Sequence, residues 1–227
     1  MAVNYMSEFD ISILDNYKPG GAILASPDQY VGELIVDHKQ LKFLANPRDN
    51  IDYLSGDFRF ASQKEYHKKH ISVILESPHR FEYNASNHPL GLAMGKTGYL
   101  FCDMFASALS KSDMHIKDGH YNIILMNAVQ YQTSCGLNPI DRDIRNQNWL
   151  DIFGKHKGNL DLKKRIYAIK PRYTINCCTG GRNPNGLRAR VSQALETYKL
   201  IKGKHFTEGN HPASWWFNGD TRHAKID

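Results

Sequence analysis

The pattern of apolar and polar positions changes near residue 69. Before about residue 68, short apolar patches are mixed with turn signals such as Pro19-Gly20-Gly21, which predict a helical or irregular N-terminal layer. After that point, short apolar runs of strand length alternate with stretches in which apolar residues recur at helical spacing. The predicted strands are 71–75, 122–129, 172–178 and 204–208, and the predicted helices are 97–109, 143–153, 160–169 and about 184–198.

This alternation of strands and helices predicts an α/β fold. We expect a three-layer α/β/α sandwich with a central, mostly parallel four-stranded sheet. Residues 1–227 are expected to form a single domain, with 69–227 as the core and 1–68 as an N-terminal layer or extension. Ligands of such sheets bind beyond the carboxyl ends of the strands. The candidate functional residues therefore follow the predicted strands, at 76–79, 127–130, 179–182 and from 211.

The amino-acid composition and net charge limit the classes of protein and of binding partner to be expected. The 227 residues are 41% hydrophobic, and no apolar run reaches the roughly 18 residues that would span a bilayer. The chain start has no signal-peptide pattern, and the four cysteines match no zinc spacing. We expect a cytoplasmic protein with reduced thiols, no metal and no other cofactor. The net charge of +6 favours a polyanionic partner such as nucleic acid.

Polar and aromatic residues near the strand ends suggest chemistry on a nucleobase. Asn127 offers an acceptor and two donors in one plane, which matches a pyrimidine edge, although it could instead cap the next turn. His211 can donate a hydrogen bond to developing negative charge, although it is one of 11 histidines and could be a surface residue. Trp215 and Trp216 cannot both face one side of a strand, so we expect at least one to be exposed.

These residues belong to an ordered set of motifs that resembles the uracil-DNA glycosylase superfamily. Members have a strand that ends in a Gly-Gln-Asp-Pro-Tyr or Gly-Glu-Ala-Pro-Gly type motif, a second strand that ends in Leu-Asn-Ala-Val, and a late His-Pro-Ser-Pro-Leu loop. The corresponding stretches here are VILESPH (73–79), LMNAV (125–129) and HPASW (211–215). GLAMGKTGYLFCDM (91–104) is similar to the family's Gly-Arg-Ala-Gly segment and the helix after it. The resemblance covers about residues 70 to 220.

The resemblance implies an enzyme that flips a base out of the duplex and cleaves its N-glycosidic bond. His211 would donate to the base's O2, and Asn127 would hold its Watson–Crick edge. Backbone amides around Ser77, Pro78 and His79 would add contacts. Trp215 occupies the place of the family's apolar wedge and would fill the vacated space in the stack. Alternatively, Trp215 and Trp216 close the C-terminal edge of the core.

The chain departs from the family at the residues that act on water and on the base. Ser77 replaces the aspartate that activates water in the best-known branch, and Glu76 stands where another branch has glutamate. We therefore nominate Glu76 to position water or to stabilise the sugar cation, with Glu82 and Asp103 as alternatives. The cysteines do not match the iron–sulfur pattern of the glutamate branch, so no cluster is expected.

Two aromatic walls of the family's pocket are also missing. His79 stands in place of a tyrosine, and Ala93 or Met94 in place of a phenylalanine. A wider pocket suits a pyrimidine with a bulky 5-substituent, and glucosylated hydroxymethylcytosine of phage DNA is one candidate. The chain is thus predicted to be a monofunctional, monomeric DNA glycosylase in antiviral defence, acting on DNA that contains a modified or damaged pyrimidine.

Several residues are candidates for contacts with DNA: Lys96, Gly181, Arg182, Ser214 and Trp215, with Arg188 and Arg190 as further phosphate ligands or simply a solvated helix face. Three other functions stay open. These are uracil-DNA glycosylase activity in base excision repair, DNA binding without catalysis, and nucleotide binding. The last rests on GLAMGKT (91–97), which has three residues between its glycines where a phosphate-binding loop has four.

Overall fold

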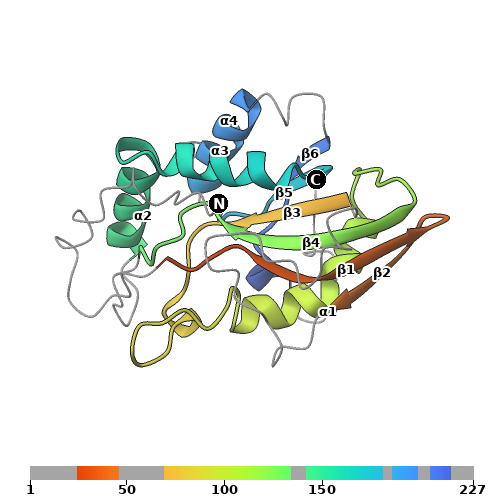
Figure 1. Cartoon of the computed structure of the whole chain (residues 1–227), viewed down its shortest axis with the longest axis horizontal. Coiled ribbons are helices and arrows are strands. Elements are labelled where there is room, and N and C mark those ends of the chain that lie inside the picture. Colours follow the sequence, from red (N-terminus) through yellow and green to blue (C-terminus); the bar gives the residue numbers. More distant parts are fainter. Residues whose placement is uncertain (1–24, 46–68, 134–141, 181–185, 199–204, 216–227) are drawn as a thin grey trace, which may run out of the picture.

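The computed structural model describes residues 25–45, 69–133, 142–180, 186–198 and 205–215 (Figure 1). Within these residues, six strands form one mixed sheet in the order β2-β1-β4-β3-β5-β6. The strands are β1 (Gln29–Asp37), β2 (Gln40–Ala45), β3 (Lys69–Leu75), β4 (Gly119–Asn127), β5 (Tyr173–Asn176) and β6 (His205–Glu208). The helices are α1 (Lys96–Ser110), α2 (Arg142–Leu150), α3 (Gly158–Ile169) and α4 (Leu187–Thr197).

The predicted α/β class is confirmed, but the predicted four-stranded sheet is wrong. β4, β3, β5 and β6 are parallel, whereas β1 runs antiparallel to both β2 and β4. The two additional strands come from the segment for which helices or irregular structure were predicted. Their hairpin turns at His38 and Lys39, which adopt φ values of 46° and 67°. Such turns favour Asn-Gly or Asp-Gly, so the usual hairpin signal is absent from the sequence.

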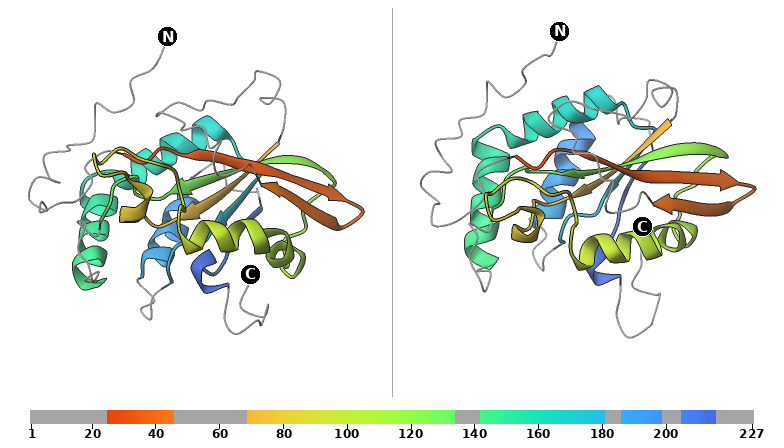
Figure 2. Two further views of the ribbon diagram at one scale, coloured as in Figure 1. Left: turned by 90° about the horizontal axis from the view of Figure 1, so that it is seen from below. Right: turned by 60° about the horizontal axis from the view of Figure 1, so that its bottom comes forward.

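Helices cover both faces of the sheet. On one face, Phe105 of α1 shares a core cluster with Leu125 of β4. On the other face, Ile166 of α3 and Val191 of α4 share a second cluster with Met126. Adjacent residues of β4 therefore face opposite layers, as strand geometry requires. Figures 1 and 2 show α1 on the opposite side of the sheet from α3 and α4. None of the helices among the described residues has the length and apolar character needed to cross a membrane.

The register of the parallel strands brings their carboxyl ends to one edge of the sheet. Leu75 of β3 lies opposite Asn127 of β4, and Ile74 lies opposite Asn176 of β5. Asn176 in turn lies opposite Glu208 of β6. The residues that follow these positions therefore emerge side by side, which positions the candidate site.

Candidate functional site

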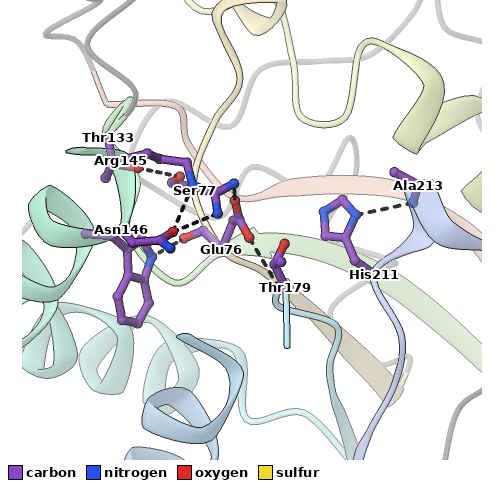
Figure 3. A network of polar contacts seen from close by, with 9 residues as sticks. Glu76, Ser77, Thr133, Arg145, Asn146, Thr179, His211 and Ala213 are labelled. Atoms are coloured by element: carbon purple, nitrogen blue, oxygen red, sulfur yellow. Dashed lines mark hydrogen bonds and ion pairs between the residues drawn. The ribbon is translucent and has the colours of Figure 1, made fainter. Parts of the chain in front are cut away.

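Glu76 is the first residue after β3, and its carboxylate is held from two sides. One oxygen accepts a hydrogen bond from Arg145 Nη1 of α2 at 2.7 Å, and the other accepts from the Thr179 backbone N–H at 3.3 Å (Figure 3). The Glu76 backbone carbonyl accepts from Trp149 Nε1 at 2.8 Å. The side chain is only 10% exposed. These contacts fix the direction in which the carboxylate points.

Arg145 is a residue of the site that the sequence did not reveal. Its Nε and Nη2 both donate to Asn146 Oδ1, at 3.1 and 2.7 Å, so the guanidinium plane is fixed as well (Figure 3). Arg145 and Glu76 are 69 positions apart, and only the packing of α2 against the end of β3 brings them together. Nearby, the Ser77 hydroxyl and the Thr133 hydroxyl form a hydrogen bond of 2.9 Å.

His211 lies at the start of a short 3-10 turn formed by Pro212–Ser214. Its Nδ1 accepts a hydrogen bond from the Ala213 N–H at 3.2 Å, so the neutral ring carries its hydrogen on Nε2. Burial lowers the pKa of His211 below 6.5, with Glu76 opposing the shift and Arg145 adding to it. In Figure 3 the free edge of the ring is turned toward Glu76 and Thr179. At neutral pH the site thus holds a neutral imidazole with an available Nε2–H.

The loop that carries His211 is supported by Arg188 of α4. Arg188 Nη1 donates to the Gly209 carbonyl at 2.8 Å, and its Nε lies 3.8 Å from the Glu208 carboxylate. The guanidinium is engaged by the protein, so the expectation of a merely solvated helix face is wrong for Arg188, and a phosphate contact stays a prediction. Arg190, two positions later, is exposed.

Asn127 is the last residue of β4 and is 1% exposed. Its backbone carbonyl accepts from Arg165 Nη2 of α3 at 2.9 Å. Arg165 also forms an ion pair with Asp28, with Nη1 and Oδ1 at 2.7 Å. Asp28 immediately precedes β1, so the N-terminal layer, to which the sequence assigned no role, supports the strand end that carries Asn127.

Glu82 lies close to three candidate site residues, His79, Ala93 and Asn127. It ends a 3-10 turn at Arg80–Glu82 and is 6% exposed. Burial raises the pKa of Glu82 to about 8, while the backbone amides of Ala93 and His79 and the side chain of Asn127 favour its charged form. Neither Glu82 Oε2 nor Asn127 Nδ2 makes a well-aligned hydrogen bond to any described residue. From the sequence, Glu82 was only an alternative to Glu76.

The segment before α1 is held by the N-terminal layer as well. The Leu92 N–H donates to Gln29 Oε1 of β1 at 2.8 Å within the protein interior. Ala93 follows, buried and with a φ of 54°, and Met94 is partly exposed. Lys96 is exposed at the first position of α1. β1 thus fixes the place of Ala93 beside Glu82.

The expectation that Trp215 is an exposed DNA wedge is wrong. Its side chain is 0% exposed and stacks on Phe101 of α1, with ring centroids 6.0 Å apart. Its Nε1 donates to the Asn210 carbonyl at 2.9 Å. The alternative that Trp215 closes the edge of the core is confirmed, while Trp216 lies outside the described residues. Ser214 is exposed, and its hydroxyl donates to the His211 carbonyl at 2.7 Å.

An exposed aromatic residue does lie next to the site, at Phe81. Its side chain is 60% exposed, and its ring centroid lies 4.8 Å from that of His79. The Arg80 guanidinium lies 5.0 Å from the Phe81 centroid, within range of a cation–π contact. His79 Nδ1 accepts from the Phe81 N–H at 3.3 Å, and burial together with Arg80 lowers the pKa of His79. An apolar ring and a cation therefore project from the loop that follows Pro78.

Gly181 and Arg182, predicted to contact DNA, lie outside the described residues. Among the described residues, Asp37, His38 and Asp118 form a group whose potential metal-ligand atoms lie within 4.8 Å of one another. All three are exposed and lie near the amino end of β4, at the opposite edge of the sheet from Asn127. They take no part in the candidate site.

Comparison with known proteins gives no family for this chain. No protein-family model matches its sequence, and a search of curated proteins found no match either.

Proposed function

We propose that this protein is a DNA glycosylase that hydrolyses the N-glycosidic bond of an extrahelical pyrimidine. The single observation that carries the proposal is the neutral His211, whose Nε2–H faces the Glu76 side of the site. In the reaction the bond between C1′ and N1 breaks, and its electron pair leaves with the base. Water adds to C1′ and its proton passes to the solvent or the base, which leaves an abasic site.

His211 would stabilise the departing base. As the bond breaks, negative charge develops on O2 of the pyrimidine, and a fixed donor that meets this charge lowers the barrier. A single donor of this kind contributes about 3 kcal/mol, which is roughly a hundredfold in rate. The Ala213 N–H that occupies Nδ1 supports this role because it leaves Nε2–H as the only donor of the ring.

Glu76 would act on the sugar side of the reaction. A negative carboxylate near C1′ opposes the positive charge that develops on the sugar, and it can orient the attacking water. Arg145 and the Thr179 N–H each bind one of its oxygens, so Glu76 is suited to a fixed electrostatic role.

Phe81 replaces Trp215 in our proposal as the side chain that enters the base stack. It is exposed, apolar and in the same loop as His79, which are the properties that a wedge requires. Arg80 beside it and Lys96 at the start of α1 are the proposed phosphate contacts.

We further propose a pyrimidine modified at C5 as the substrate, with glucosylated hydroxymethylcytosine as one candidate, and a role in defence against phage. The sequence supports a substrate larger than uracil, because His79 and Ala93 or Met94 stand where the glycosylases that this chain resembles have a tyrosine and a phenylalanine. The protein would act as a monomer in the cytoplasm.

The proposal is tested with duplexes that each carry one uracil, one thymine–guanine mismatch, one 5-hydroxymethylcytosine or one glucosylated 5-hydroxymethylcytosine. Abasic sites are detected by alkaline strand cleavage. We expect cleavage at a 5-modified base, and its loss in His211→Ala but not in His115→Ala, which removes an exposed histidine before β4. Efficient cleavage at uracil alone would refute the 5-modified substrate. Binding without cleavage of any duplex would identify a catalytically inactive DNA-binding protein.

A further inference from the structure

Glu82 lies where three segments of the candidate site meet. The backbone amides of His79 and Ala93 and the side chain of Asn127 lie close to its carboxyl and favour its charged form. Burying a carboxyl group costs stability unless its bonds are satisfied, and Glu82 Oε2 has no well-aligned partner among the described residues. Packing alone therefore does not account for an acid at this position.

Glu82 lies beside the Asn127 carboxamide, which can adopt two orientations. A carboxamide has an acceptor oxygen at one end and an NH₂ donor at the other, and rotation by about 180° exchanges them. A charged Glu82 can only accept, so it draws the Asn127 Nδ2 toward itself. A protonated Glu82 can also donate to Asn127 Oδ1, which makes the reversed orientation available.

The two orientations of the carboxamide match two different bases. Cytosine presents the acceptor N3 beside an amino donor at C4, whereas uracil presents the N3–H donor beside the acceptor O4. A carboxamide oriented to pair with the cytosine edge would set its donor against the donor of uracil and its acceptor against the acceptor of uracil. Asn127 alone is compatible with both bases, so its orientation must be set by a neighbouring group.

We propose that Glu82 is a positioning residue that orients the Asn127 carboxamide and so decides between cytosine-type and uracil-type substrates. This inference rests on the proposed glycosylase function and on the proximity of Glu82 to Asn127. It also rests on the burial of both residues, with Glu82 Oε2 and Asn127 Nδ2 lacking a hydrogen-bond partner among the described residues. Glu82 does not touch the reacting bond in this scheme. It acts through the carboxamide of Asn127.

The surroundings of Glu82 make this choice dependent on pH. Burial raises the pKa of Glu82 to about 8, so its acid form predominates at neutral pH and its charged form above that value. The adjacent Tyr83 has its pKa raised by burial and by Glu82, and His79 has its pKa lowered by burial. Tyr83 and His79 therefore stay neutral while Glu82 titrates.

The test compares two substrates that differ only in the edge that Asn127 reads. Release of 5-hydroxymethylcytosine and of 5-hydroxymethyluracil from otherwise identical duplexes is measured as a ratio of kcat/KM between pH 6.5 and 9.5. Ionisations that affect both substrates alike, such as that of His211, cancel in this ratio. One bidentate contact discriminates by about 1–3 kcal/mol, so the ratio for the wild type should change by about tenfold or more as Glu82 titrates.

Glu82→Gln keeps the shape and the donor and acceptor of the protonated acid but does not titrate. Its ratio should equal that of the wild type below pH 7 and stay constant above pH 8. The matched control is Glu196→Gln, an exposed position on α4, which should follow the wild-type curve. If Glu82→Gln follows the wild-type curve as well, Glu82 does not orient Asn127.

Failure of this inference is distinguishable from failure of the proposed function. A wild type that releases both bases in a ratio independent of pH would overturn the role of Glu82 and leave the glycosylase activity intact, even if Glu82→Gln does not fold. A wild type that releases no base would overturn the proposed function, and the role of Glu82 with it.

Discussion

The buried carboxyl of Glu82 should make the stability of this protein depend on pH, and Glu82→Gln should remove that dependence. The pKa of Glu82 is about 8 in the folded protein because of burial, against 4.5 for an ordinary glutamate. Between these values the folded protein keeps a proton that the unfolded chain has lost. The contribution of this proton to the free energy of unfolding is fully present below about pH 4.5. It is lost as the pH rises toward 8.

The size of the effect follows from the two pKa values. Their difference, about 8 minus 4.5, corresponds to about 5 kcal/mol in the free energy of unfolding, at about 1.4 kcal/mol for each pH unit. Glutamine has the same shape and no charge, so Glu82→Gln should lose none of this stability. Asp28, whose pKa burial raises to about 6, titrates in both proteins and cancels in the comparison.

The measurement is urea denaturation of the wild type and of Glu82→Gln at pH 5, 6.5, 8 and 9.5. The difference in free energy of unfolding should shift in favour of the glutamine variant by several kcal/mol between pH 5 and 8, and then become constant. A difference that does not vary with pH would show that Glu82 is charged at neutral pH, and the reasoning would be refuted.

Four further changes follow from the described contacts. His211→Ala should reduce base release by about a hundredfold in single-turnover assays, because it removes the donor to the departing base; an unchanged rate would exclude His211 from catalysis. Trp215→Ala should lower the free energy of unfolding by about 3–5 kcal/mol in urea titrations, since the residue is buried in the core. If this variant instead keeps the wild-type stability and no longer releases the base, Trp215 acts as a wedge. Phe81→Ala should weaken excision from duplex more than from single-stranded DNA while the melting temperature is retained, and equal losses on both substrates would exclude a wedge. Arg145→Met should leave the Glu76 carboxylate without its buried partner and destabilise the protein by about 3 kcal/mol, measured by urea denaturation; a neutral effect would mean that the ion pair does not form in solution.

The strands that position the site could be predicted from the sequence because their apolar runs are continuous. Residues 71–75 and 122–129 are such runs, and the structure places β3 and β4 there. β1 and β2 could not be found in this way. In β2 most side chains are exposed, and the hairpin turns at His38 and Lys39 without the usual glycine. The antiparallel pairing of β1 with β4 likewise depends on how the whole sheet assembles and not on a local sequence pattern.

The positions of Glu76, Asn127 and His211 at strand ends could also be predicted, because parallel strands end at one edge of the sheet. The expectation for Trp215 was wrong for a local reason. Side chains alternate between the two faces only in a strand, whereas Pro212–Ser214 form a 3-10 turn and Trp215 follows it. The contacts of Arg145 and Arg165 could not be predicted, because both partners are distant in the sequence. Arg145 is 69 positions from Glu76, and Arg165 is 137 positions from Asp28.

The central claim is that water replaces a pyrimidine at C1′ of a nucleotide in DNA. The most direct measurement is mass spectrometry of the products formed in water labelled with the heavy oxygen isotope, from a duplex that contains a 5-modified pyrimidine. We predict an intact, unlabelled free base and a single labelled oxygen on the abasic sugar. Label in the base, or a duplex that stays intact with every pyrimidine tested, would contradict it.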